Sequence, residues 1–211
     1  MNQSSYLTAR TVPQTERGKK TRRQLLDAAE VEFGRAGFEA ASIGDITKRA
    51  GVAQGTFYLY FTDKTAIFSE LVDELGARLR HHLGAAVQGK KSRFDIERAG
   101  MRAFFEFTRE HTALYRIIRQ AEFVDLAAFR RYYERMAASY VRALKASQQA
   151  GEVAKIDPEV LAYCLMGVSD FLGMRYVLWG DEAADLDRVT EHAMRLVSTG
   201  MAVPPRGASK R

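Results

Sequence analysis

The sequence predicts an all-α protein of about nine helices, and three observations lead to this fold class. Pro158 is the only proline between residues 16 and 203 of the 211-residue chain. β-branched residues are scarce over the same stretch, and apolar residues recur at spacings of three and four. These features favour helices throughout, because proline interrupts a helix and the 3.6-residue repeat gives one an apolar face.

The first predicted helix covers about Glu16 to Ala36, and Gly37 supplies its left-handed C-terminal stop. A short helix follows, at whose start Ser42 and Asp45 form a capping box. Both helices are expected to turn an apolar side inward, and the stripe of the first consists of Leu25, Leu26, Ala29 and Phe33.

Gly51 ends the short helix, and the next helix spans about Gln54 to Tyr60. Asp63 caps a long fourth helix that ends at Gly89. Its apolar stripe recurs at every fourth position and consists of Ile67, Leu71, Leu75, Leu79 and Leu83.

The rest of the chain predicts five further helices. Asp157 followed by Pro158 is a typical helix start, since aspartate caps and proline suits the first turn. The expected bounds are about 92–110, 112–120, 125–149, 158–179 and 186–201. We therefore expect a flexible arm (1–15), a helix-turn-helix domain (16–62), a ligand-binding and dimerisation domain (63–203) and a flexible basic tail (204–211).

Charge is distributed unevenly along the chain. The net charge is +6, with +4 in residues 1–91, −1 in residues 92–202 and +3 in the tail. A basic N-terminal part suits a polyanion such as DNA, although a solubilising surface explains it equally well.

Residues 43–61 carry the pattern most specific to a function. Gly51 at a short turn lets two helices cross steeply, and Ile46, Ala50, Val52, Phe57 and Phe61 are spaced to point inward. The second helix presents uncharged hydrogen-bonding groups, which suit base edges and phosphates. The residues expected to contact DNA are Arg22, Ser42, Ala53, Gln54, Thr56, Tyr58, Tyr60 and Lys64.

This region resembles the N-terminal domain of TetR/AcrR-family transcriptional regulators. The resemblance covers about residues 19–70 and rests on Thr21–Ala29, Phe33, Gly37-Phe38, Ser42–Ile46, Ala50–Val52, Gly55–Phe61, Lys64 and Phe68. The family pattern often has alanine at position 47 and histidine at position 60, where this chain has Thr47 and Tyr60. The resemblance implies a cytoplasmic homodimer that binds double-stranded operator DNA as a repressor and is released by a small molecule.

In the family, the last two helices of each subunit form a four-helix dimer interface. By position these are residues 158–179 and 186–201. The first of them carries an apolar ridge suited to such an interface, although the same ridge could belong to the core. The ridge consists of Leu161, Leu165, Val168, Leu172 and Tyr176.

An aromatic-rich central region is the expected effector site. Packing is the simpler explanation for most of these rings, and an apolar ligand cavity is the functional one. The expected lining is Phe104, Phe107, Tyr115, Phe129, Tyr133 and Tyr163, with Arg116, Arg119, Arg130 and Arg131 near its mouth. The run 113–123 weakly resembles regulators that respond to fatty acids or acyl-CoA, so the effector would be apolar or acyl. A drug-efflux repressor with a broad apolar pocket and a nucleic-acid-binding protein without a ligand are the alternatives.

Other chemistry finds little support in the sequence. No metal motif, glycine-rich phosphate loop or nucleophile elbow is present, so we expect no enzyme, cofactor or metal. Cys164 lies in an apolar run, which predicts a buried thiol. No uninterrupted apolar run reaches the ~18 residues of a membrane span, and the first residues lack the apolar region of a secretory signal.

Overall fold

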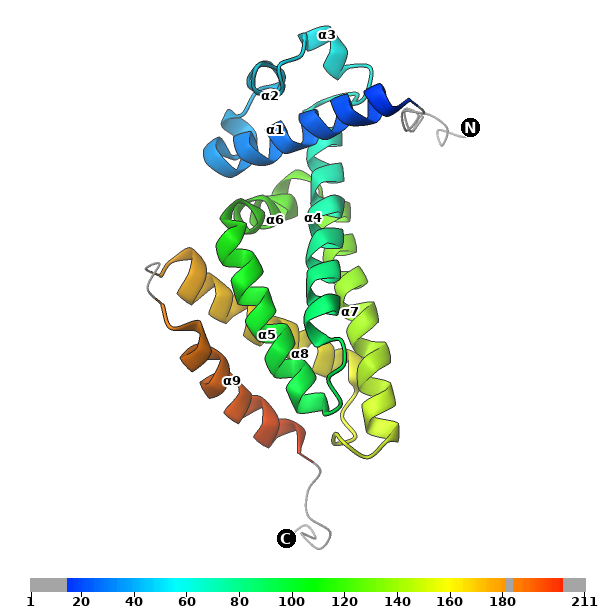
Figure 1. Ribbon diagram of the computed structural model, residues 1–211, viewed down its shortest axis with the longest axis vertical. Helices are drawn as coiled ribbons and strands as arrows, with labels where there is room; N and C mark the ends of the chain where they lie inside the picture. The colour runs from blue at the N-terminus through cyan, green and yellow to red at the C-terminus, as the bar shows by residue number, and fades with distance from the viewer. Residues whose placement is uncertain (1–14, 181–183, 203–211) are drawn as a thin grey trace, which may run out of the picture. The chain divides into compact units, whose positions relative to one another are not determined.

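The computed structural model describes residues 15–180 and 184–202, and every regular element in these ranges is helical (Figure 1). The predicted fold class is therefore confirmed. The elements are α1 (Glu16–Ala40), α2 (Ile43–Ala50), α3 (Gln54–Phe57), α4 (Lys64–Val87), α5 (Arg93–Glu110), α6 (Thr112–Val124), α7 (Leu126–Gln149), α8 (Pro158–Gly173), the π-helix η1 (Met174–Leu178) and α9 (Leu186–Met201).

The chain forms two compact units, and each includes two separate stretches of sequence. Among the described residues, the head unit contains residues 15–74 together with Arg116–Phe129, and the C-terminal unit contains Leu75–Tyr115 together with residues 130–180 and 184–202. The predicted division between residues 62 and 63 therefore differs from the observed one. The first turns of α4 and most of α6 belong to the head because they pack on α1.

Aromatic rings hold α1 and α4 together inside the head unit. The ring of Phe33 lies 5.2 Å from that of Phe68 and 5.7 Å from that of Phe38, and Phe38 and Phe68 are 5.1 Å apart. Phe33, Phe68 and the predicted inward residue Ile46 are fully buried. Offset and edge-on ring pairs stabilise a fold by more than their buried area alone, so this cluster stabilises the packing of α1 against α4.

Gly37 bends the C-terminal end of α1, as the sequence predicts. Its φ of 82° lies in the left-handed region, which only glycine adopts without strain. The α6 side chains hold the bent segment. The Gln120 Oε1 accepts a hydrogen bond from the Phe38 amide (2.5 Å), and the Arg116 guanidinium donates to the Gly34 carbonyl (3.1 Å).

The C-terminal unit has its own core, to which α5, α8 and α9 contribute. Phe105 and Leu144 are fully buried there. Leu161 and Leu165 lie in the same core at 6% and 4% exposure, and Val168, Leu172 and Tyr176 pack against it. The apolar ridge expected at a dimer interface thus packs within its own subunit, which was the alternative explanation.

The opposite side of α8 is exposed and apolar. Phe171 (66% exposed) and Val160 (57%) lie on it, together with Tyr163. Cys164 is also exposed, so the prediction of a buried thiol is wrong. Because α8 is apolar on both sides, an apolar neighbourhood in the sequence does not indicate burial.

The segment Pro158–Leu178 could cross a membrane by length and composition alone, with 21 residues and a mean hydropathy of 1.3. The count of uninterrupted apolar residues missed it because the average tolerates a few charges. Within the chain 28% of its most apolar window is buried. Much apolar surface is therefore left for some other contact.

The end of α8 widens into the π-helix η1, which the sequence did not predict. At this point the Tyr115 hydroxyl donates to the Asp170 carbonyl (3.1 Å), which also accepts from the Met174 amide. A side chain on Gly173 would collide with the Tyr115 hydroxyl and with the Phe104 ring at 3.0 Å. Glycine is thus required for the close approach of these rings to α8.

Candidate nucleic-acid interface and effector cavity

Local signals in the sequence fix the crossing of α2 and α3. The Ser42 hydroxyl accepts a hydrogen bond from the Asp45 amide (3.1 Å), and the Asp45 carboxylate accepts from the Ser42 amide (3.3 Å) and hydroxyl (2.6 Å). These hydrogen bonds lower the pKa of Asp45. Gly51 ends α2 in the left-handed conformation, with φ of 69°. The predicted capping box and the left-handed glycine at the turn are therefore confirmed.

The α3 region presents uncharged groups to solvent, as expected. Gln54 and Ala53 are exposed, Tyr58 is 42% exposed, and Thr56 and Tyr60 are half-buried. Phe57 is fully buried and anchors the turn against Phe61, with ring centroids 5.5 Å apart. The α-helix itself ends at Phe57 and is shorter than predicted.

Three other predicted DNA contacts have partners inside the head unit. Arg22 forms an ion pair with Glu70 and lies 5.5 Å from the Phe61 ring centroid. Burial raises the pKa of Glu70 although Arg22 acts against this. The Ser42 hydroxyl is used in the capping box described above. Lys64 is half-buried, and its Nζ donates to the carbonyls of Phe38 (2.7 Å), Ala41 (3.0 Å) and Glu39 (3.3 Å).

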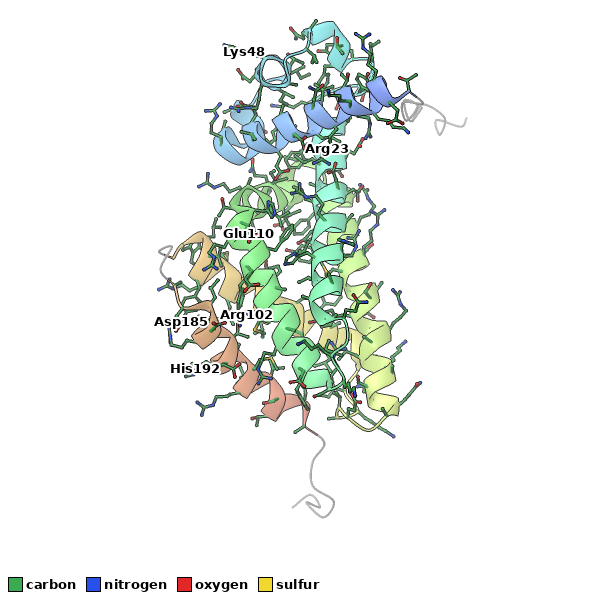
Figure 2. All side chains as sticks on the ribbon, in the orientation of Figure 1. Arg23, Lys48, Arg102, Glu110, Asp185 and His192 are labelled. Atoms are coloured by element: carbon green, nitrogen blue, oxygen red, sulfur yellow. The ribbon has the colours of Figure 1, made fainter. Side chains whose placement is uncertain are left out.

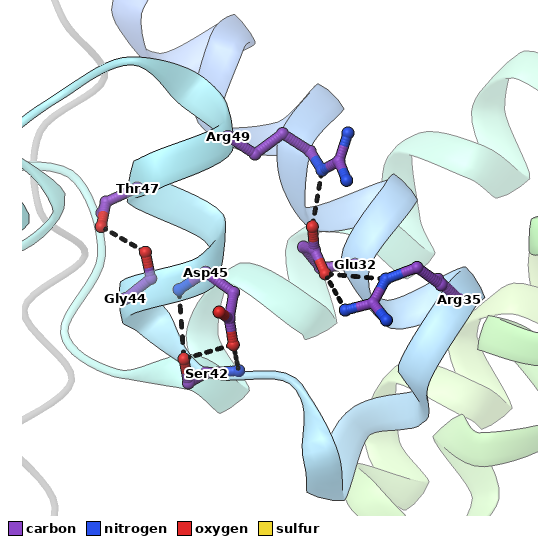
Figure 3. A network of polar contacts seen from close by, with 7 residues as sticks. All are labelled: Glu32, Arg35, Ser42, Gly44, Asp45, Thr47 and Arg49. Carbon is purple, nitrogen blue, oxygen red and sulfur yellow. Dashed lines mark hydrogen bonds and ion pairs between the residues drawn. The ribbon is translucent and has the colours of Figure 1, made fainter.

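A buried carboxylate joins α1 to α2 (Figure 3). Glu32 accepts hydrogen bonds from the Arg35 Nη2 (2.8 Å) and from the Arg49 Nε (2.6 Å). The hydrogen bonds from Arg35 and Arg49 lower the pKa of Glu32, against the effect of burial. This network fixes the direction of α2 and adds net positive charge beside it.

Lys48 is a cation of α2 that the sequence analysis did not select. It is exposed in the last turn of the helix, and Figure 2 shows it on the outer side of the head. Lys48 lies two residues after the buried Ile46, about 200° around the helix, and this place opposite the apolar side is the signal that could have identified it.

An apolar cavity of about 300 Å³ lies inside the C-terminal unit, between α4, α5, α7 and α8. Its lining includes Leu83, Met101, Met136 and Met166. The polar or charged side chains of the lining are Arg80, Arg93, Tyr132, Tyr133, Ser139, Tyr140, Ser169 and Asp170. The volume is at the lower end of the range for small-molecule sites.

Comparison with known proteins identifies the family of this chain. The family described as "Bacterial regulatory proteins, tetR family" matches residues 25–71. The "Uncharacterized HTH-type transcriptional regulator YdgC" of Bacillus subtilis (strain 168) is 31% identical over 169 residues, which cover 78% of this chain and 85% of that protein. The chain belongs to the TetR family.

Solved structures of other TetR-family regulators have the same fold. The fatty acid degradation regulator FadR from Bacillus halodurans has a TM-score of 0.74 at 22% identity, covering 84% of this chain and 94% of that one. FadR from Bacillus subtilis, in complex with stearoyl-CoA, has a TM-score of 0.73 at 22% identity, covering 84% and 98%. A putative TetR-family regulator from Rhodococcus sp. gives 0.74 at 17% identity, covering 87% and 100%.

The structure of this TetR-family regulator brings together some of the predicted effector residues and separates others. Phe104 and Tyr133 line the cavity. Phe107 is buried beside His111, with ring centroids 4.5 Å apart, and Tyr115 reaches α8 instead. Phe129 belongs to the head unit, and Tyr163 lies on the exposed side of α8.

The arginine predictions also need revision. Arg116, Arg119, Arg130 and Arg131 are absent from the cavity lining, whereas Arg80 and Arg93 belong to it. Arg80 follows Leu79 of the α4 stripe directly, so nothing in the sequence distinguishes it from a solvent-facing charge.

Proposed function

We propose that this TetR-family transcriptional regulator binds operator DNA as a homodimer through α2 and α3, in the cytoplasm, and represses until a small molecule occupies the C-terminal cavity. The exposed polar surface of α3 is the observation that carries the proposal. Gln54 suits an adenine edge, and the hydroxyls of Thr56, Tyr58 and Tyr60 suit phosphates. Ala53 precedes them and leaves room for close approach.

A second copy of the chain is the proposed partner of the exposed apolar side of α8. This surface is defined by Val160, Tyr163, Gly167 and Phe171, and Leu196 of α9 is 71% exposed. An exposed apolar patch of this kind marks an interaction surface, and a two-fold pairing of α8 and α9 with those of a second subunit would bury it. The TetR-family four-helix interface supports this arrangement.

The cavity supports an effector and speaks against a nucleic-acid-binding protein without one. We propose an apolar or acyl molecule, in line with the FadR structures. Ligand binding would tilt α4, which extends continuously from Lys64 to Val87, and change the spacing of the two heads. A drug-efflux repressor remains the second candidate, because methionines adapt to varied apolar ligands.

Selection of bound fragments from random DNA tests the proposed function. We expect recovery of an inverted repeat whose half-sites lie one helical turn apart, about 34 Å. Gln54→Ala should relax the preference at one base pair in each half-site, and Tyr58→Phe should weaken binding about equally for all sequences. Recovery of no sequence, or of a single unrepeated site, would contradict a dimeric operator-binding protein.

A further inference from the structure

Most polar side chains that line the cavity already have partners within the protein. The Arg93 guanidinium and the Tyr140 hydroxyl both donate to the buried Glu97 carboxylate, at 2.8 Å from Nε and 2.6 Å from the hydroxyl. The Ser169 hydroxyl donates to the Leu165 carbonyl (3.1 Å). Ser139 accepts from Arg142 (3.3 Å), and Tyr133 and Asp170 also have partners.

Arg80 and Tyr132 differ from the rest of the lining. Within residues 15–180 and 184–202, neither the Arg80 guanidinium nor the Tyr132 hydroxyl meets a hydrogen-bond acceptor or a carboxylate. Both groups can donate, and neither is sealed from the cavity: Arg80 is half-buried, and among the described residues no fully buried side-chain nitrogen or oxygen lacks a hydrogen-bond partner. A ligand in the cavity can therefore accept hydrogen bonds from both.

The close approach of both side chains to α4 depends on a glycine of that helix. A Cβ on Gly76 would lie 2.9 Å from Tyr132 Cδ2 and 3.2 Å from Arg80 Nη1. The missing side chain lets the ring and the guanidinium lie against the helix one turn before Arg80. Their arrangement is therefore packed, not a free surface conformation.

We infer that Arg80 and Tyr132 bind the carboxylate of an aliphatic acid whose chain fills the apolar part of the cavity. The inference rests on the proposed effector function and names its ligand class. A carboxylate accepts from both donors and neutralises the guanidinium, whereas the carbonyl of a thioester carries no charge. A cavity of about 300 Å³ is at the lower end of the range for small-molecule sites, which fits a medium-length aliphatic chain.

Asp170 makes a cationic ligand the rival. Its carboxylate lines the same cavity, and both Asp170 and Arg80 act on the pKa of Tyr132, which burial raises. The anion is favoured because Asp170 already has a partner in the protein, while the two donors do not.

Calorimetric titration of the full-length protein with decanoate, decanol, decylamine and decanoyl-CoA, all below their micellar concentrations, tests the inference. We expect decanoate to bind at least tenfold more tightly than decanol. Arg80→Gln should weaken decanoate binding about tenfold to a hundredfold and leave decanol unchanged, since the lost hydrogen bonds involve charges. Tyr132→Phe should cause a smaller loss, and the exposed Arg109→Gln is the matched control.

Three outcomes would overturn the inference. Equal binding of acid and alcohol would show that no cation is engaged. Tighter binding of decanoyl-CoA that is independent of Arg80 would indicate the thioester, and tight binding of decylamine that is lost in Asp170→Asn would indicate a cation site. The DNA selection on the wild-type protein without ligand tests the proposed function by itself, so its failure is recognised separately from a failure of these titrations.

Discussion

Replacing Lys64 with methionine separates a structural role from a DNA contact. The substitution keeps most of the stem on Phe38, whose ring centroid lies 4.3 Å from Nζ, and removes the donor to three carbonyls. One hydrogen bond from a charged group contributes about 1.5–3 kcal/mol, and a cation over an exposed ring about 0.5–1 kcal/mol. Since one half-buried charge serves all three carbonyls, we expect a total loss of about 2–3 kcal/mol.

Urea denaturation at fixed protein concentration measures this loss of stability. DNA binding at several salt concentrations tests whether Lys64 contacts a phosphate. The slope of log K against log salt should stay unchanged, because the ammonium already faces the chain. A lysine that contacts a phosphate would instead lower the slope by about 1. Exposed Lys20→Met is the stability control. If Lys64→Met is as stable as the wild type and its salt slope is reduced, Lys64 contacts DNA and does not stabilise the fold through the three carbonyls.

Three further substitutions test other parts of the fold. Phe171→Glu should yield monomers in sedimentation. Loss of the α8 pairing should also speed the alkylation of Cys164, which is exposed on the same helix. An unchanged dimer would exclude the α8 interface. Glu32→Gln should cost about 1–2 kcal/mol at pH 7. Because the pKa of Glu32 is lowered in the folded protein, its contribution is present above the ordinary value of about 4.3 and lost as the pH falls through the lower folded value, so the variant should show a flatter acid limb in denaturation. Gly173→Ala should cost about 1–3 kcal/mol, or roughly 2–12 °C in Tm, and an unchanged Tm would show that Tyr115 moves aside freely.

Local chemistry explains what could be predicted from the sequence. The Ser42–Asp45 capping box, the left-handed Gly51 and the Asp157 cap all depend on neighbours within four residues. Such signals identify helix ends and, with the family resemblance, the helix-turn-helix. The α3 surface was predicted for the same reason, because its residues lie on one short segment.

Tertiary partners explain what could not be predicted. Lys64 and Arg22 are cations near the expected interface, and only their distant partners in the fold show that they are engaged. In α8 both sides are apolar, so the periodicity did not distinguish the core residue Leu165 from the exposed Phe171. Arg80 differs from other surface charges only in its place in the cavity lining, which depends on how α4, α5, α7 and α8 pack together.

The composition of the head unit limits how such regulators can exchange their DNA-reading parts. Consider a chimera of two relatives that is joined at a single crossover after residue 62. Gln120 and Arg116 would then come from a different parent than the backbone groups of Phe38 and Gly34 to which they hydrogen-bond. The hybrid would leave the bend at Gly37 without its support. Chimeras should keep full operator affinity when α1–α3, the first turns of α4 and residues 116–129 are inherited from the same parent.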